Sequence, residues 1–257
     1  MTPSPIPAEL IARLRAARRV AVLTGAGISA ESGVPTFREA QTGLWARYNP
    51  EELATPDAFH RNPKLVWEWY AWRQERVRRA EPNPGHIALV EMERRIAGFT
   101  LITQNVDGLH RRAGSHQVLE LHGNLFRAKC LDEDRPVENW PDSEEIPPRC
   151  PRCGALLRPD VVWFGEMLPA GALRAAEQAA ATAEVFFSIG TSALVYPAAD
   201  LPFTALRAGA MVVEINPQPT PLSSQVSFSL NGPAGEILPA LVEQVWGASV
   251  PAGGTDT

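Results

Sequence analysis

A chain of 257 residues can bury one large core and a smaller satellite lobe, so we expect one main domain. Its 24 Lys and Arg residues are outnumbered by 29 Asp and Glu residues, and a net charge of −5 disfavours non-specific binding to nucleic acid. No apolar window approaches the roughly 18 residues of a membrane span, no secretory signal is evident, and the three cysteines are an odd number. These features predict a cytoplasmic protein in a reducing compartment, with no membrane partner.

Helical and strand-like patterns alternate along the chain. Leu10, Leu14 and Ala17 recur at the spacing of helical turns, and the apolar run that follows them ends in glycine. Further apolar strands are predicted over 98–103, 184–190 and 210–216, each after an alanine- or arginine-rich helical stretch. The alternation predicts an α/β fold, doubly wound, with a mainly parallel Rossmann-like sheet.

Two segments interrupt this alternation. One is rich in aromatic residues (43–79), and the other is acidic, rich in proline and bounded by cysteine (130–159). We expect this helical insertion and this cysteine module to form a smaller lobe within one domain spanning 1–257. The expected large lobe covers about 1–40, 85–125 and 160–250, the small lobe covers about 41–84 and 126–159, and 251–257 is predicted to be a disordered tail.

The stretch LVWEWYAWR, residues 65–73, is predicted to be a helix. Leu65, Trp69 and Trp72 follow four- and three-residue steps and would form a stripe that faces the core. Tyr70 and Arg73 lie three apart on a neighbouring face, where they either pack or hold a ligand. A guanidinium fork beside a phenol hydroxyl in a partly dry pocket suits a carboxylate.

Glycine and polar residues follow the first predicted strand, in the stretch TGAGISAESGVPTFR (24–38). In open α/β sheets, ligands bind beyond the carboxyl ends of the strands, and glycines let the backbone approach a phosphate. A tight structural turn would explain Gly25 and Gly27 as well. The next glycine is Gly33, so the spacing departs from G-x-G-x-x-G and disfavours a hydride-transferring dehydrogenase.

Polar residues also follow the other predicted strands. They are the cluster from Gln104 to His110, His122 in the stretch VLELHGNL, the run from Gly190 to Ser192, and Asn216. Each could by itself be a helix cap or a hydrogen-bonded structural residue. With the glycine-rich stretch after the first strand they make five groups, and five groups at the same edge of one sheet predict a ligand site.

Several of these stretches together resemble the sirtuins, which are NAD-dependent protein lysine deacylases. The resemblance rests on GAGISAESGVPTFR, TQNVDGLHRRAG, LHG before the cysteine module, GTS and the asparagine at the end of the last strand, and it runs from about Val20 to about Leu241. It implies that NAD is consumed as a co-substrate. The products would be nicotinamide, O-acyl-ADP-ribose and free lysine.

The resemblance also implies roles for individual residues. Those that would contact NAD are Gly25, Ala26, Gly27, Ile28, Ser29, Gln104, Asn105, Asp107, Gly190, Thr191, Ser192, Asn216 and Ala234, with Phe37 and Arg38 on a loop that closes over it. Catalysis would rest on Asn105 and on His122, the general base that accepts a ribose hydroxyl proton. An acyl-lysine peptide would bind as an added strand between the lobes, against Val161, Phe164, Gly165 and Val195.

In sirtuins of the class III type, a Tyr-x-x-Arg pair on the corresponding helix binds the distal carboxylate of succinyl- or malonyl-lysine. Tyr70 and Arg73 match that pair, and TGLW at 42–45 also resembles this class. The resemblance therefore implies removal of acidic acyl groups, with deacetylation as a secondary activity.

The small lobe of this family usually holds a structural zinc ion between two Cys-x-x-Cys pairs. Here Cys150 and Cys153 form one pair, but the other has Cys130 followed by Glu133 where the second thiolate belongs. Because zinc accepts carboxylate oxygen, three thiolates with Glu133, or with a neighbouring aspartate, could still complete a site. A degenerate module with reduced thiols and no metal is the competing interpretation.

Two other functions are compatible with the same motifs. ADP-ribosyl transfer to protein shares the release of nicotinamide and needs only a different nucleophile. A non-catalytic module that senses NAD is the other alternative, and the presence of His122 argues against it.

Overall fold

The computed structural model describes residues 5–34, 48–137 and 145–247. The predictions for Phe37, Arg38, the TGLW stretch at 42–45 and the tail at 251–257 lie outside these residues. Among the described helices, none combines the length and the apolar composition needed to cross a membrane.

The large lobe contains a six-stranded sheet in the order β3-β2-β1-β7-β8-β9, and every neighbouring pair is parallel. Its strands are β1 (Arg19–Thr24), β2 (Gly98–Thr103), β3 (Val118–Glu120), β7 (Val185–Ile189), β8 (Met211–Asn216) and β9 (Phe228–Asn231). The four apolar runs predicted as strands are all found here. The continuous burial along β1, β7 and β8 is typical of parallel strands that are covered on both faces.

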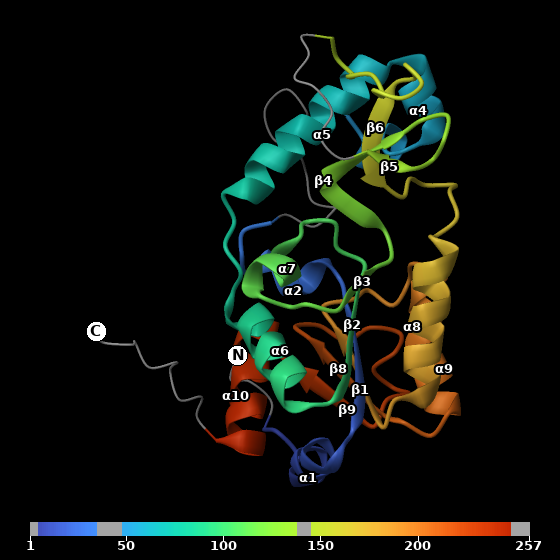
Figure 1. The fold of residues 1–257 in the computed structure, drawn as a ribbon. Helices are drawn as coiled ribbons and strands as arrows, with labels where there is room; N and C mark the ends of the chain where they lie inside the picture. The colour runs from blue at the N-terminus through green and yellow to red at the C-terminus, as the bar shows by residue number, and fades with distance from the viewer. Residues whose placement is uncertain (1–4, 35–47, 138–144, 248–257) are drawn as a thin grey trace, which may run out of the picture.

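Helices cover both faces of this sheet (Figure 1). One face carries α1 (Ala8–Ala16), α6 (Pro84–Arg95) and α10 (Ala234–Trp246), and the other carries α8 (Ala170–Thr182) and α9 (Leu201–Arg207). Successive strand residues serve the two cores in turn, because side chains alternate along a strand: Val22 packs with the first group and Leu23 with the second. The predicted doubly wound fold class is confirmed.

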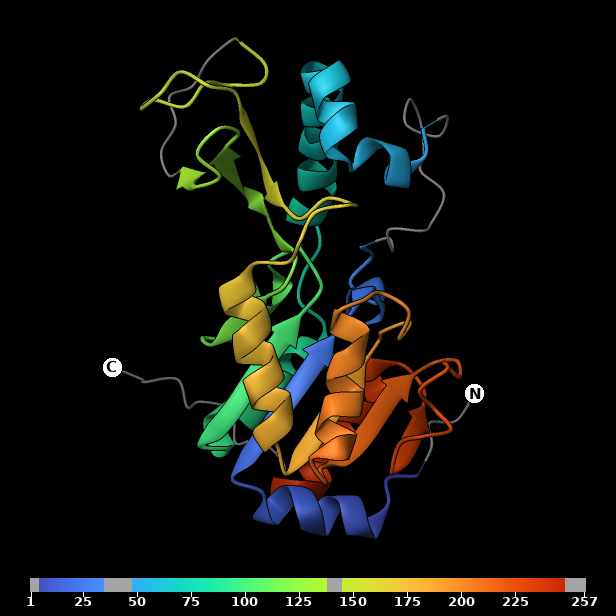
Figure 2. The same ribbon diagram turned by 90° about the vertical axis from the view of Figure 1, so that its right-hand side faces the viewer.

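The small lobe lies beyond the carboxyl ends of the parallel strands (Figure 2). It combines α3 (Pro50–Leu53), α4 (Pro56–Arg61) and α5 (Pro63–Arg78) with an antiparallel sheet of β5 (Pro136–Val137), β4 (Gly123–Cys130) and β6 (Leu157–Val161). Each of these helices begins with proline after a residue whose side chain accepts a backbone N–H, namely Asn49, Thr55 and Asn62. Short helices α2 (Ala26–Ala30) and α7 (Leu109–Ala113) and the 3₁₀ turn η2 (Ala198–Asp200) lie near the sheet edge.

The buried face of α5 differs from the predicted one. Its buried residues are Val66, Trp69, Tyr70 and Val77, whereas Leu65 and Trp72 are only partly buried. Trp69 faces the core as predicted, but Tyr70 belongs to the core and not to a separate face. The helix is apolar over more than half of its circumference, so sequence hydrophobicity did not reveal which side packs against β4 and β6.

Candidate active site

The loops that follow β1 and β7 contact each other through their main chains. The Gly27 N–H donates to the Gly190 carbonyl over 2.9 Å, and the Gly25 N–H donates to the Ile189 carbonyl over 3.0 Å. A Cβ atom on Gly190 would lie 2.5 Å from the Ile28 nitrogen, and the φ angle of Gly190 is +60°. Glycine is therefore required at this contact. The close approach of the two loops is a structural reason for these glycines, in line with the tight turn considered as an alternative from the sequence.

This contact marks the point where the strand order reverses. From β1 the sheet continues through β2 to β3, and from β7 it continues in the opposite direction through β8 to β9. In doubly wound sheets, dinucleotides bind in the crevice that forms at this reversal, beyond the carboxyl ends of the strands. The predicted site residues around Gly25 and Gly190 therefore lie where a dinucleotide is expected.

A buried hydrogen-bond chain joins the loop after β2 to the loop after β1. Asn105 Nδ2 donates to the Gly25 carbonyl over 3.0 Å and to Ser29 Oγ over 3.1 Å, and Ser29 Oγ donates to Asp107 Oδ2 over 2.8 Å. Burial raises the pKa of the Asp107 carboxyl, and hydrogen bonds from Leu109 and Ser29 oppose that rise. Both amide hydrogens of Asn105 are thus used, which leaves Oδ1 as an acceptor at the sheet edge.

His122 lies in the turn between β3 and β4. Its Nδ1 atom is 2.9 Å from the Gln104 carbonyl oxygen, and because a carbonyl can only accept, Nδ1 carries the proton. Burial lowers the pKa of His122, and the hydrogen bond to Gln104 opposes that effect. The neutral ring then has its lone pair on Nε2, so this atom can accept a proton near pH 7.

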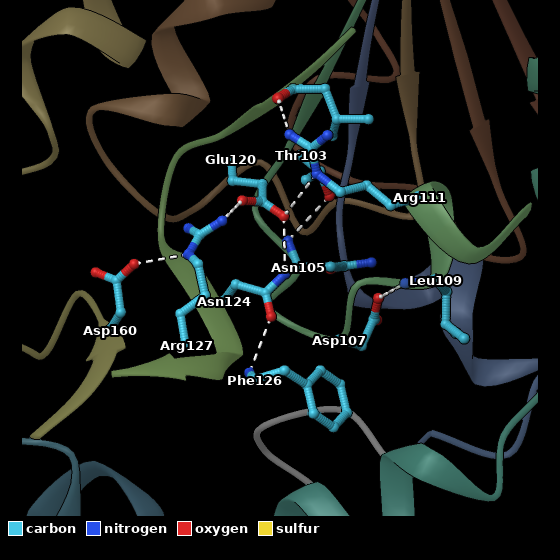
Figure 3. Close-up of polar contacts among 11 residues, drawn as sticks. Thr103, Asn105, Asp107, Leu109, Arg111, Glu120, Asn124, Phe126, Arg127 and Asp160 are labelled. Atoms are coloured by element: carbon cyan, nitrogen blue, oxygen red, sulfur yellow. Dashed lines mark hydrogen bonds and ion pairs between the residues drawn. The ribbon is translucent and has the colours of Figure 1, made fainter. Parts of the chain in front are cut away.

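An ion-pair cluster around Glu120 holds the turn that carries His122 (Figure 3). Glu120 ends β3 with its side chain 8% exposed, and it is a buried carboxylate that the sequence pattern did not single out. It accepts hydrogen bonds from Arg127 Nη1 at 2.6 Å and Asn124 Nδ2 at 2.8 Å, and it forms an ion pair with Arg111 Nε at 3.5 Å. Arg127 also pairs with Asp160 on β6 over 2.9 Å, so the turn is connected to both sheets.

A second polar group lies at the ends of β1 and β2; the polar stretches predicted to follow these two strands included its members Thr24 and His110 but not Thr103 or His86. The Thr24 hydroxyl is 2.8 Å from the Thr103 hydroxyl and 2.9 Å from His110 Nε2, and the His110 ring packs against the His86 ring with 4.9 Å between their centres and a tilt of 54°. Burial lowers the pKa of His86 to about 4 and that of His110 well below its ordinary value, so both rings are neutral at pH 7. The sequence signal that could have revealed this group is a threonine at the end of each of two apolar strands, Thr24 in β1 and Thr103 in β2.

The loops after β7 and β8 are also joined. Asn216 Nδ2 donates to the Thr191 carbonyl over 2.7 Å, while Ser192 on the same loop is exposed. Two other predicted NAD contacts lie in the core of the large lobe: Ile28 is fully buried and Ala234, at the start of α10, is 5% exposed. Their contact with a ligand remains a prediction.

Tyr70 and Arg73 lie in the small lobe, and Tyr70 contacts the segment after β6, which also contacts His122. The Val162 N–H donates to the His122 carbonyl over 2.9 Å, and the neighbouring Trp163 Nε1 donates to the Tyr70 hydroxyl over 2.9 Å. Burial raises the pKa of Tyr70 to about 12, so its hydroxyl is protonated. The Arg73 guanidinium lies 4.9 Å from the Trp69 ring centre and 5.7 Å from that of Tyr70.

The four residues predicted to contact a peptide differ in exposure. Phe164 is 49% exposed, Val195 is 39% exposed and Gly165 is exposed, whereas Val161 is buried in the core of the small lobe. The Phe164 N–H donates to the Ala54 carbonyl, so the exposed segment is anchored to the small lobe. Three of the four can therefore meet a bound peptide directly.

The three cysteine sulfur atoms all lie within 4.8 Å of one another, and those of Cys130 and Cys153 are 3.4 Å apart. Backbone N–H groups of Arg152 and Cys153 lower the pKa of the Cys150 thiol to about 7. Three thiols at this spacing match the donors that structural zinc prefers. The carboxylate of Glu133, the predicted fourth ligand, pairs with the Arg152 guanidinium instead.

Together the fold and this site define a nucleotide-binding protein of the doubly wound class, with a neutral histidine at the ligand edge and a thiol-bearing second lobe. The model of the Sir2 family matches residues 25–197 of the chain. The chain belongs to the Sir2 family, so the resemblance to the sirtuins predicted from the sequence motifs is confirmed.

Several relatives are similar over nearly their whole length. NAD-dependent protein deacylase 2 of Pyrobaculum aerophilum is 55% identical over 238 residues, which cover 90% of this chain and 93% of the relative. An NAD-dependent protein deacylase of Deinococcus radiodurans is 56% identical, with 90% and 96% covered. A solved Sir2 homologue in complex with NAD is 48% identical, with a TM-score of 0.86 and 94% of each chain covered. A solved complex of Sir2, p53 peptide and NAD⁺ is 31% identical, with a TM-score of 0.80 and 92% and 97% covered.

Proposed function

We propose that this chain is an NAD-dependent protein lysine deacylase that removes succinyl and malonyl groups faster than acetyl groups. Its relatives named NAD-dependent protein deacylases support the general activity. The acyl preference rests on one observation: the Arg73 guanidinium lies 5.7 Å from the centre of the Tyr70 ring, and the Tyr70 hydroxyl is bound by Trp163, next to the residue that contacts the His122 carbonyl.

Bound NAD would supply an electrophilic ribose carbon and nicotinamide as its leaving group. The glycine contact at Gly25, Gly27 and Gly190 would provide the backbone surface against which the dinucleotide lies. Asn105 would present Oδ1 to it, since both of its amide hydrogens are used within the protein. His122 would accept a ribose hydroxyl proton at Nε2, because Nδ1 is held as a donor by the Gln104 carbonyl.

The substrate peptide would lie along the exposed segment that includes Phe164 and Gly165, opposite Val195. A lysine side chain extending from that segment toward His122 would place its acyl group near Tyr70, since Val162 contacts the His122 carbonyl and the neighbouring Trp163 contacts the Tyr70 hydroxyl. A distal carboxylate on the acyl group would then pair with Arg73 and accept from Tyr70.

Rates on acetyl-, malonyl- and succinyl-lysine peptides with NAD test this preference. We expect Arg73→Met to reduce kcat/KM for desuccinylation at least about tenfold, since a charge-assisted hydrogen bond contributes about 1.5–3 kcal/mol, and to change deacetylation little. Arg76→Met, which removes an exposed arginine from the same helix, is the matched control. Equal losses on succinyl and acetyl peptides in the Arg73 variant would refute the carboxylate contact.

The same reactions distinguish the other functions. Mass spectrometry of O-acyl-ADP-ribose against ADP-ribosylated protein separates deacylation from ADP-ribosyl transfer. An absence of nicotinamide release in the presence of acylated peptide would identify a non-catalytic NAD-binding module. We also propose a cytoplasmic location, which three free thiols favour.

We further propose that Cys130, Cys150 and Cys153 hold a structural zinc ion, with Glu133 completing the site after release from Arg152. The site would stabilise the small lobe and take no part in the reaction. Metal analysis of the purified chain should find one zinc per molecule, lost in Cys150→Ser together with thermal stability. A metal-free chain whose Tm is unchanged by that substitution would support the degenerate module.

A further inference from the structure

The Tyr70 hydroxyl has a defined direction of hydrogen bonding. Its partner is Trp163 Nε1, at 2.9 Å. An indole N–H can only donate, so the Tyr70 oxygen is the acceptor in this bond and its own proton points elsewhere. Among the residues that the structure describes, no acceptor for that proton is found. Tyr70 is 1% exposed, so an acceptor on a bound ligand that reached this hydroxyl would receive the proton in a buried setting.

Trp163 is itself held on three sides. Its backbone N–H donates to Glu166 Oε2 over 2.8 Å, and the Arg158 guanidinium lies 3.3 Å from its ring centre. Arg158 makes a bidentate pair with Glu166 at 2.5 and 2.9 Å and donates to the Val161 carbonyl over 2.9 Å. Phe59 packs against another part of the indole at 5.3 Å. The ring therefore has little freedom to turn its N–H away from Tyr70.

The cluster also balances its own charge. Glu166 neutralises Arg158. Burial alone would raise the pKa of the Glu166 carboxyl, but the hydrogen bonds from Arg158 and Trp163 outweigh burial and lower that pKa. The Arg73 guanidinium lies 5.7 Å from the centre of the Tyr70 ring. This guanidinium and the outward O–H of Tyr70 are both hydrogen-bond donors.

We propose that Trp163, held by the Arg158–Glu166 pair, is a positioning residue that fixes Tyr70 as a hydrogen-bond donor and thereby sets the preference for a carboxylate-bearing acyl group. The inference deepens the proposed function and rests on it. A carboxylate accepts at every lone pair, whereas a terminal amide carries donors that would meet the Tyr70 proton and the Arg73 guanidinium. Trp163 thus acts through Tyr70 and need not touch the substrate.

The test compares Michaelis constants of four enzymes on succinyl- and acetyl-lysine peptides: wild type, Trp163→Phe, Tyr70→Phe and the double variant. Trp163→Phe removes the N–H and keeps an aromatic ring. We expect it to raise KM for the succinyl peptide about three- to tenfold, the range for one hydrogen bond of about 0.7–1.4 kcal/mol, with kcat and the acetyl KM unchanged. In the Tyr70→Phe background, Trp163→Phe should add no further loss.

The control is Phe59→Leu, which disturbs the packing of the Trp163 ring without removing a polar contact. It should leave the succinyl-to-acetyl ratio unchanged. If Trp163→Phe does not fold, Glu166→Gln serves instead; it keeps the side-chain size, weakens the hold on Trp163 and should shift the ratio in the same direction by a smaller factor.

Three outcomes would overturn the inference. The first is an equal change on both peptides in Trp163→Phe, and the second is the same loss whether or not Tyr70 is present. The third is a wild-type enzyme with no preference for succinyl over acetyl, which would end the proposed acyl preference as well. A wild type that prefers succinyl and a Trp163→Phe variant with an unaltered ratio would reject this inference alone.

Discussion

The ligand edge of the large lobe and the proposed acyl pocket of the small lobe differ in the contacts that join their separate segments. At the ligand edge three of these contacts end on the main chain, namely Gly27 to Gly190, Asn105 to the Gly25 carbonyl and His122 to the Gln104 carbonyl, beside the side-chain bond of Ser29 to Asp107. In the proposed pocket the bonds of Tyr70 to Trp163 and of Arg158 to Glu166 join side chains.

This difference has a consequence for what each region tolerates. A main-chain contact between two glycines leaves no room for another residue, because any Cβ atom would overlap the facing backbone. A side-chain contact can be changed at one position while the backbone stays in place. We therefore expect substitution of the glycines at the ligand edge to impair NAD-dependent activity on every acyl peptide. Substitution of single side chains in the proposed acyl pocket should instead change the preference among acyl groups.

The largest expected effect comes from Gly190→Ala. The new Cβ would lie 2.5 Å from the Ile28 nitrogen and 2.7 Å from Gly27, at a φ of +60°. We expect a loss of at least about 3 kcal/mol in the free energy of unfolding and the loss of stabilisation by NAD, measured by denaturant unfolding with and without NAD.

Gly209→Ala is the matched control for that variant. Gly209 also has a positive φ, of +84°, but no atom lies within 4 Å of the added Cβ. It should lose only the backbone term, about 1 kcal/mol, and keep its response to NAD. Similar behaviour of the two variants would contradict the idea that contact between the two loops is what requires glycine.

A smaller but more selective effect is expected for His122→Ala. Removal of a general base reduces the rate by about 10²–10⁴, and we expect this loss on all acyl peptides while NAD still raises the Tm. His116→Ala, at an exposed position, is the control. Wild-type turnover in His122→Ala would remove this residue as the base.

The pH dependence sharpens the same assignment. Because burial lowers the pKa of His122, the neutral ring persists to lower pH than an exposed histidine would allow. The acid limb of kcat/KM should therefore lie below about pH 6.5, the ordinary histidine value. An acid limb above that value would contradict the role of His122 as the titrating base.

The smallest effect on stability at neutral pH is expected for His86→Gln, on α6, where the ring packs against His110. The pKa of His86 is about 4 in the folded chain against 6.5 when unfolded, so the unfolded state binds more protons between these values. Stability should fall as pH drops from 6.5 towards 4, by about 3 kcal/mol from this residue, and His86→Gln should flatten that slope in urea unfolding. An unchanged slope, matching the exposed control His60→Gln, would show that His86 does not cause it.

Much of the ligand edge could be predicted because it depends on local patterns. Apolar runs that end in glycine, asparagine or histidine identified the strands and the edge to which their ends contribute, and the contacts of Gly27 with Gly190 and of Asn105 with Gly25 follow from parallel pairing. The Sir2 family was evident from two of these stretches alone.

Other features depend on side chains that are distant in the sequence. Glu120 forms ion pairs with Arg127 and Arg111, and Trp163 lies 93 residues along the chain from Tyr70, to which it donates a hydrogen bond. No spacing rule predicts such pairs, because they form only when separate elements pack. The buried side of α5 also depends on which elements pack against it, and its prediction from the sequence was wrong by one residue position along the helix. The ion pair of Glu133 with Arg152 likewise forms only when separate segments pack.

The sequence by itself determined the alternation of helices and strands and the residue types that follow the strands, because these arise from short-range periodicity and turn chemistry. The reversal of strand order between β1 and β7 came from the tertiary structure. Only the tertiary structure decided that the Tyr70 hydroxyl accepts a hydrogen bond from Trp163 in the proposed acyl pocket. Hydrogen-bond direction is a property of two groups brought together by packing, and a linear pattern does not contain it.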